Sequence, residues 1–204
     1  MALDPSLTEF STTSPNPMVI DYNDVETGLG YVDFYAMKTY LAAGAEQILS
    51  DQAEYSSDIA TTRVAAGTTT FTFKSSGFNR VRTVRGTAIF SCGIGGLNSN
   101  ITVTARLQKY NSVGPVTTNL SDVITSSVYS PGGVAAGMMI LLQLPLTETI
   151  IAEGEALILL VTLATDGIQT GEIGHDPQGR DGAFVTAANQ VTSVMKVAVP
   201  FRVE

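Results

Sequence analysis

Apolar residues gather in short runs along this chain, and the densest run is Ala156–Ala164. This run is too short to cross a bilayer and too continuous for a strand with one face in water, so it predicts a strand buried on both sides. A shorter apolar segment, Ile150–Ala152, precedes it across Glu153-Gly154-Glu155, where glycine permits a tight turn. We therefore expect the hydrophobic core to form around Ala156–Ala164.

Alternating apolar and polar residues predict further strands before this core strand. Thr68–Lys74 places Phe71 and Phe73 on one face, and Ile101–Leu107 places its odd-numbered residues inward and its even-numbered residues outward. Val81–Cys92 alternates in part. Short strands of this kind, separated by Gly, Asn and Pro turns, indicate an all-β fold, either an antiparallel sandwich or a barrel.

Glycine and proline set the expected ends of several strands. Gly93–Gly96 predicts a turn between strands, and Pro145 is expected to end a strand predicted over Met138–Leu146. The chain closes with an alternating strand over Ser193–Val203. Because Pro200 cannot donate a ladder hydrogen bond, that end of the strand is expected at a sheet edge or a bulge.

The N-terminal region lacks a sustained apolar period. Residues 1–30 are rich in proline, glycine, serine and threonine, a composition typical of an extended arm that becomes ordered only against another surface. A disordered tail is the alternative, but such a tail would have no need of an apolar patch. The patch consists of Met18, Val19, Ile20 and Tyr22, which we predict to be partner-binding anchors.

The stretch Tyr31–Ser50 is ambiguous between helix and strand. Its aromatic first half suits a strand, and Gly44 interrupts the helical face that the apolar residues would otherwise form. A strand followed by a turn or a short helix is favoured. The expected organisation is therefore an arm over residues 1–30 and a β-domain over residues 31–204.

The net charge of −8 conceals a segregation of charge along the chain. Residues 1–60 carry ten acids against Lys38 alone, whereas residues 61–110 carry seven bases and no acid. The acidic region can therefore lie on a basic face of its own or of a neighbouring subunit. Arg80 and Arg82, which would share a strand face, are predicted to contact such an acidic partner, with a solvated face as the alternative. Nucleic acid is not expected as a partner, because the whole molecule would repel phosphate.

Residues suited to catalysis or metal binding are few. His175 is the single histidine, no G-x-S-x-G motif occurs, and the single cysteine, Cys92, falls in a strand pattern that predicts a small buried hydrophobe. Three acids near the histidine could supply oxygen ligands to calcium, but their spacing matches no EF-hand; they are Glu172, Asp176 and Asp181. We therefore expect no enzyme activity, no cofactor and no metal.

The polar segment around the histidine is predicted to be a structured turn. In this interpretation the Asp176 carboxylate accepts backbone N–H bonds, Pro177 fixes the chain and Arg180 pairs with an acid, beside His175. The role of these four residues is then architectural. The N-terminus has no basic region followed by an apolar one, and no segment reaches membrane-spanning length, so a soluble protein made in a cytoplasm and without a membrane partner is expected.

The C-terminal third, Leu144–Glu204, combines the strand TETIIAEGEALILLVTL, the loop with His-Asp-Pro and Arg180, and a final strand that ends in VPFRV. In these motifs it resembles β-sandwich structural proteins of tailed-bacteriophage virions. The resemblance implies an antiparallel jelly-roll-like β-sandwich that cements or decorates the capsid surface of the virion. It further implies binding to the major capsid protein as a homo-oligomer, with a trimer favoured.

Two other functions stay open from the sequence. A tail- or fibre-associated module that binds a carbohydrate or receptor is the first, although the chain has no tryptophan for a sugar platform. An enzyme is the second, and it would need two carboxylates that converge in a cleft from distant segments.

Overall fold

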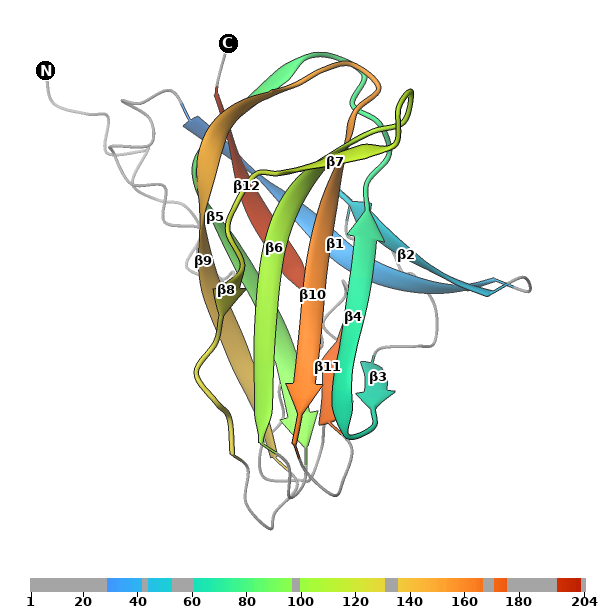
Figure 1. Ribbon diagram of the computed structural model, residues 1–204, viewed down its shortest axis with the longest axis vertical. Helices are drawn as coiled ribbons and strands as arrows, with labels where there is room; N and C mark the ends of the chain where they lie inside the picture. Colours follow the sequence, from blue (N-terminus) through green and yellow to red (C-terminus); the bar gives the residue numbers. More distant parts are fainter. Residues whose placement is uncertain are drawn as a thin grey trace, which may run out of the picture.

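The structure is a computed structural model of the chain, and it describes residues 29–41, 44–52, 61–96, 100–130, 136–166, 171–175 and 194–202. These residues form β-strands and no helix (Figure 1). The strands are β1 (Leu29–Leu41), β2 (Gly44–Ser50), β3 (Thr61–Val64), β4 (Gly67–Lys74), β5 (Arg82–Gly96), β6 (Ile101–Asn111), β7 (Val116–Asn119), β8 (Ile124–Thr125), β9 (Ala136–Ile151), β10 (Ala156–Thr165), β11 (Gly171–Gly174) and β12 (Lys196–Arg202). The prediction of an all-β fold is confirmed.

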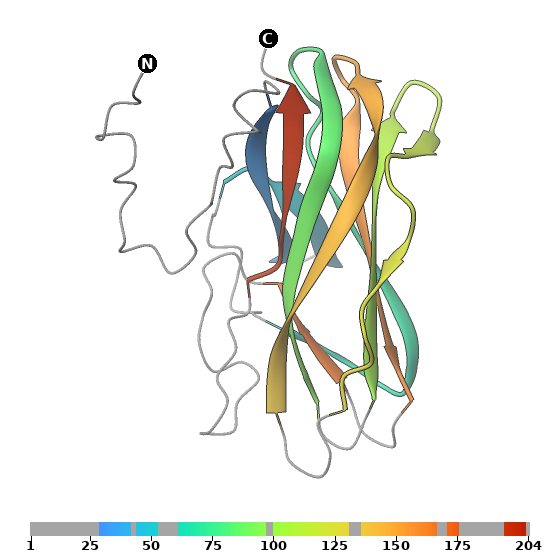
Figure 2. The same ribbon diagram turned by 90° about the vertical axis from the view of Figure 1, so that its left-hand side faces the viewer.

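The strands pack in two layers, as expected of a β-sandwich (Figures 1 and 2). One layer contains β4, β10 and β6, with β7 and β8 at its far edge. The other contains β9, β5, β12 and β1, and β11 and β3 extend it beside one end of β5. All pairings are antiparallel except one bridge, Ile48 with Lys74, through which β2 reaches the edge strand β4.

Two strands connect the layers. The first, β1, pairs with β12 along its first half and with β2 along its second half, so the hairpin leaves one layer and approaches the other. The second, β9, pairs with β5 from Ala136 to Ile151 and runs diagonally across the sandwich (Figure 2), and its Leu146 also bridges to Ser121 of the other layer.

The core lies between the layers, and β10 runs through the middle of one of them. Ala156–Leu159 are buried without interruption, as predicted. From Leu160 onward buried and half-buried residues alternate, so the prediction of burial on both faces is wrong for the second half of the strand. Its outer face lies at the surface of the molecule. The largest fully buried side chains are Leu49, Phe73, Phe90, Ile94, Ile101, Leu107, Leu120, Leu144, Ile151, Leu157, Leu159 and Leu163.

Three predicted boundaries are wrong because strand pairing overrides local signals. Gly93–Gly96 is not a turn but the end of β5, where β9 and β11 pair with it on both sides. The second half of Tyr31–Ser50 is the strand β2 rather than a turn or a short helix. Pro145 does not end its strand; β9 continues to Ile151, and Pro145 faces Thr87 close to a register shift in β5.

Other local predictions hold. Phe71, Phe73 and the odd-numbered residues 101–107 point into the core, and Glu153-Gly154 forms the turn between β9 and β10 with Gly154 at a φ of +83°. Pro200 lies at a bulge between β12 and β5. The strand β1 begins at Leu29, two residues inside the predicted arm; residues 1–28 lie outside the described part of the chain. No helix long and apolar enough to cross a membrane occurs among the described residues.

Candidate functional site: a phenylalanine cleft

A cleft of about 380 Å³ opens where β4 leaves its layer and the β1–β2 hairpin passes beside it. Its walls come from β1, β2, the connection between β4 and β5, and the ends of β5 and β12. We call it the phenylalanine cleft, and it is lined by Val32, Phe34, Ile48, Leu49, Ser50, Asp51, Ser75, Ser76, Gly77, Phe78, Asn79, Arg82 and Phe201. Its volume is at the lower end of the range of about 300–1,000 Å³ that is usual for ligand sites.

Three phenylalanine rings form the apolar wall of this cleft. The centroid of Phe78 lies 6.3 Å from that of Phe34 and 5.8 Å from that of Phe201, and Phe34 lies 6.2 Å from Phe201. These tilted and edge-to-face arrangements are favourable for aromatic rings. Phe34 and Phe201 are buried and Phe78 is half-buried, so Phe78 presents the accessible ring of the cluster.

The connection that carries Phe78 is tied to the turn between β9 and β10. The backbone N–H of Phe78 donates to the carbonyl of Glu155, and the N–H of Gly154 donates to the carbonyl of Phe78, each at 2.8 Å. Ser75 adds a backbone N–H bond to the Leu157 carbonyl, and its Oγ accepts the N–H of Leu157, both at 2.9 Å. A Cβ at Gly77 would lie 2.9 Å from the Gly154 carbonyl oxygen, so this close approach requires glycine.

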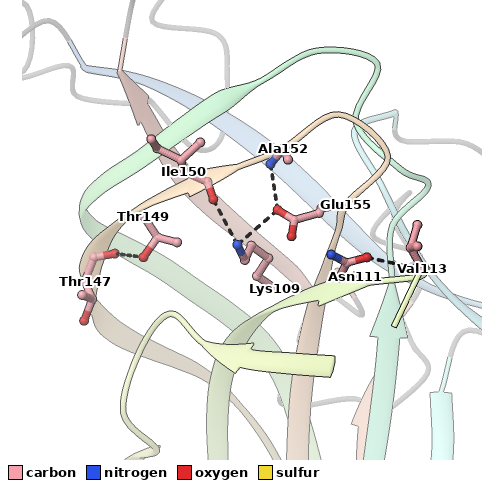
Figure 3. A network of polar contacts seen from close by, with 8 residues as sticks. All are labelled: Lys109, Asn111, Val113, Thr147, Thr149, Ile150, Ala152 and Glu155. Atoms are coloured by element: carbon pink, nitrogen blue, oxygen red, sulfur yellow. Dashed lines mark hydrogen bonds and ion pairs between the residues drawn. The ribbon is translucent and has the colours of Figure 1, made fainter. Parts of the chain in front are cut away.

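The turn between β9 and β10 is itself held in place by the buried carboxylate of Glu155 (Figure 3). Glu155 Oε2 accepts the N–H of Ala152 at 2.7 Å and pairs with Lys109 Nζ at 3.2 Å. The same ammonium group donates to the carbonyl of Ile150 at 3.2 Å. The Glu155 side chain is only 9% exposed, so this network fixes the turn on β6 and, through it, the position of Phe78.

One arginine and one carboxylate are among the residues that line the cleft. Arg82 lines the cleft, and Arg80 and Arg202 lie next to the lining residues Asn79 and Phe201 in sequence. None of these three arginines has an ion-pair partner within the part of the chain that the structure describes. Asp51 is the single carboxylate among the lining residues. Arg82 can therefore pair with a carboxylate on an apolar ligand that enters the cleft.

A second surface feature lies on the outer face of the β9–β5–β12 layer. Leu141, Met139 and Ile89 are 65%, 43% and 38% exposed. Leu141 lies opposite Ser91 and Ile89 lies opposite Gln143, so Leu141 and Ile89 are diagonal neighbours on one face, with Met139 two residues along β9. We call Ile89, Met139 and Leu141 the apolar strip.

The structure separates the two arginines that the sequence placed on one strand face. Arg80 lies in a bend before β5, and Arg82 is the first residue of β5, opposite Ile151. The ladder begins only at Arg82 because the preceding connection bonds to the β9–β10 turn instead. Of the two, Arg82 faces the cleft. The predicted anchors Met18, Val19, Ile20 and Tyr22 lie outside the described residues.

The predicted loop is described only at His175. This side chain is fully buried at the end of β11, and its Nε2 lies 2.9 Å from Thr62 Oγ1, which also accepts from Lys38 Nζ at 3.2 Å. The other residues of the predicted turn lie outside the described part of the chain: Asp176, Pro177 and Arg180. His175 is thus packed into the interior, away from the phenylalanine cleft.

The described residues include neither a metal-binding cluster nor an activated thiol. They contain no cluster of three or more His, Cys, Asp or Glu that could hold a metal ion. Cys92 is fully buried, as the sequence predicted, and its burial raises the pKa of the thiol far above its ordinary value. The thiol therefore stays protonated and is a poor nucleophile.

Neither the phenylalanine cleft nor the apolar strip has a local signal in the sequence. Phe34, Phe78 and Phe201 are far apart in the chain, and only the pairing of β12 with both β1 and β5 brings them together. Leu141 belongs to a continuous apolar run that indicates burial, and nothing local tells which residues of that run face outward. Arg82 is the one predicted contact residue that belongs to the site.

Comparison with solved structures shows the same fold in parts of larger enzymes. An aminopeptidase from the marine sediment archaeon Thaumarchaeota archaeon matches 85% of this chain with 8% identity and a TM-score of 0.55. A CocE/NonD family hydrolase from Staphylococcus aureus matches 86% with 10% identity and a TM-score of 0.53, and an α-amino acid ester hydrolase matches 84% with 10% identity and a TM-score of 0.55. No protein-family model and no curated protein sequence matches.

These similarities concern the fold. The chain spans only 36–37% of the length of the three solved proteins, and identities of 8–10% carry no residue of a catalytic site from those enzymes to this one. They support the β-sandwich as a module that occurs within larger proteins.

Proposed function

We propose that this chain is a structural protein of a tailed-phage virion, a capsid cement or decoration protein that binds the major capsid protein as a homo-oligomer. The proposal is supported by the apolar strip together with the resemblance of residues 144–204 to virion sandwiches. In this role the β-sandwich binds a partner and catalyses no reaction.

The apolar strip is the observation that carries this proposal. Monomeric proteins place isolated apolar residues on their surface, but neighbouring large apolar side chains on one sheet face are typical of protein interfaces. Leu141 has most of its surface in water, and Met139 and Ile89 lie beside it. Polar residues border the strip, including the pair of Lys196 Nζ and Asp33 Oδ2 at 2.7 Å, as is usual at the rim of an interface.

A binding role fits the described residues better than a catalytic one. A glycosidase-type site needs two carboxylates across a cleft, whereas Asp51 is the single carboxylate that lines the phenylalanine cleft. His175 is buried with Thr62 as a neighbour, and Cys92 is buried as a protonated thiol. These side chains are suited to packing.

Co-sedimentation with capsids tests the proposal. Purified full-length protein is mixed with phage heads assembled without it, and the bound fraction is measured against protein concentration. We expect saturable binding that Leu141→Asp weakens at least tenfold, because a charge is then buried in the interface. Val113→Asp is the matched control, since Val113 is 96% exposed in the turn before β7 and lies outside the strip. Absence of binding, or equal loss in both variants, would overturn the proposal.

A carbohydrate- or receptor-binding role at the tail is the second candidate, and the accessible ring of Phe78 favours it. Sugars stack on aromatic rings, so this role would make Phe78→Ala lose binding to host cells or isolated glycans. Binding to cells that depends on Phe78, without binding to heads, would replace the cement proposal by this one.

A further inference from the structure

We infer that Met18–Tyr22 binds in the phenylalanine cleft of its own subunit, with Asp21 of this segment facing Arg82. This inference concerns the free protein and does not depend on capsid binding.

The position of β1 places the N-terminal segment beside the cleft. Leu29, the first residue of β1, lies opposite Arg202, next to the lining residue Phe201. Val32 and Phe34 of the same strand line the cleft. The seven residues from Tyr22 to Leu29 can span up to about 25 Å, more than the three residues, about 10 Å, that separate Leu29 from Val32 along β1. Tyr22 can therefore reach the cleft of its own chain.

Charge favours the same occupant. Residues 1–28 contain five acids and no base. Among the lining residues, Arg82 has no ion-pair partner in the described part of the chain, and Asp51 is the single carboxylate. Asp21 lies within the apolar patch of the segment, so its carboxylate can pair with Arg82 when the apolar side chains enter the cleft.

The tether makes binding within one chain stronger than binding between chains. A short linker gives an effective concentration in the millimolar range, so a contact of modest intrinsic affinity is populated at any protein concentration. A cleft of about 380 Å³ is small, which suits a few apolar side chains such as those of Ile20 and Tyr22.

A single tryptophan can report the contact, because the chain has none. In full-length Tyr22→Trp, we expect blue-shifted emission and acrylamide quenching several-fold weaker than in Val113→Trp, whose side chain stands in the exposed turn before β7. Adding Arg82→Glu should raise the quenching of Tyr22→Trp toward that reference. Arg85→Glu is the matched control, since Arg85 lies on the same strand and pairs with Glu148 rather than lining the cleft. An unreactive Cys92 thiol verifies that each variant is folded.

Three results would overturn the inference. Quenching of Tyr22→Trp equal to that of Val113→Trp would mean that the segment is not bound. Protection that survives Arg82→Glu, or that Arg85→Glu removes to the same extent, would place the segment elsewhere. Protection that disappears on dilution would assign the cleft to the N-terminal segment of a second copy.

Discussion

A buried carboxylate can stabilise a turn only when its charge is fully compensated. Glu155 meets this condition through the Lys109 ammonium group and the Ala152 N–H. Its neighbour in the same turn, Glu153, is exposed. The two glutamates are two positions apart in the chain, and one is exposed while the other is buried, so they form a natural pair for mutation.

Glu155→Gln should lower the free energy of unfolding by about 1–3 kcal/mol. The amide keeps the size of the side chain but leaves the Lys109 ammonium, only 20% exposed, without its counter-charge. Glu153→Gln should leave stability unchanged. Urea denaturation followed by far-UV circular dichroism measures both values. Equal stability of the two variants would contradict a buried ion pair in this turn.

Strands in this sandwich are defined by their neighbours as much as by their sequence. The glycines at the end of β5 remain in a strand because β9 and β11 flank them, although isolated glycine destabilises a strand. Likewise, β10 lies between β4 and β6, but only its first half is covered on both faces. The contribution of each β10 residue to the free energy of unfolding therefore depends on whether other parts of the chain cover its side chain.

Leu159→Ala and Leu160→Ala should differ strongly in stability. Leu159 is fully buried between the layers, so its truncation leaves a cavity and costs about 2–5 kcal/mol. Leu160 is half-buried on the outer face, where solvent fills the space left by truncation. Chemical denaturation of the two variants gives the comparison. A cost at Leu160 as large as that at Leu159 would mean that another surface covers β10.

The first and last strands that the structure describes, β1 and β12, pair with each other in one layer. β12 lies between β1 and β5 and contributes Val197, Val199 and Phe201 to the core. Folding of this layer therefore requires the complete chain, and the long separation in sequence between β1 and β12 predicts slow folding, in the millisecond to second range.

Removal of β12 should prevent folding. A chain that ends at Val194 should expose Cys92, so its thiol should react with Ellman's reagent as fast as in urea. A chain that ends at Arg202 retains the whole strand and should keep the thiol protected. Protection of Cys92 in the shorter chain would show that β12 is dispensable for the core.

The sequence by itself determined the features that depend on neighbouring residues. Alternation placed Phe71 and Phe73 in the core, glycine placed the turn at Gly154, and proline placed the bulge at Pro200. Each follows from a local rule of backbone geometry or strand periodicity, which acts over a few residues and is legible in one segment. The burial of Cys92 followed in the same way.

Tertiary structure alone decided the features that depend on distant pairing. It kept Gly93–Gly96 in a strand, turned Leu141 toward solvent, and brought Phe34, Phe78 and Phe201 around one cleft with Arg82 at its rim. Periodicity assigns residues to two faces of a strand but does not say which face another layer covers. The order and register of the strands decide which face is covered, and they are set only when strands that are distant in the sequence pair.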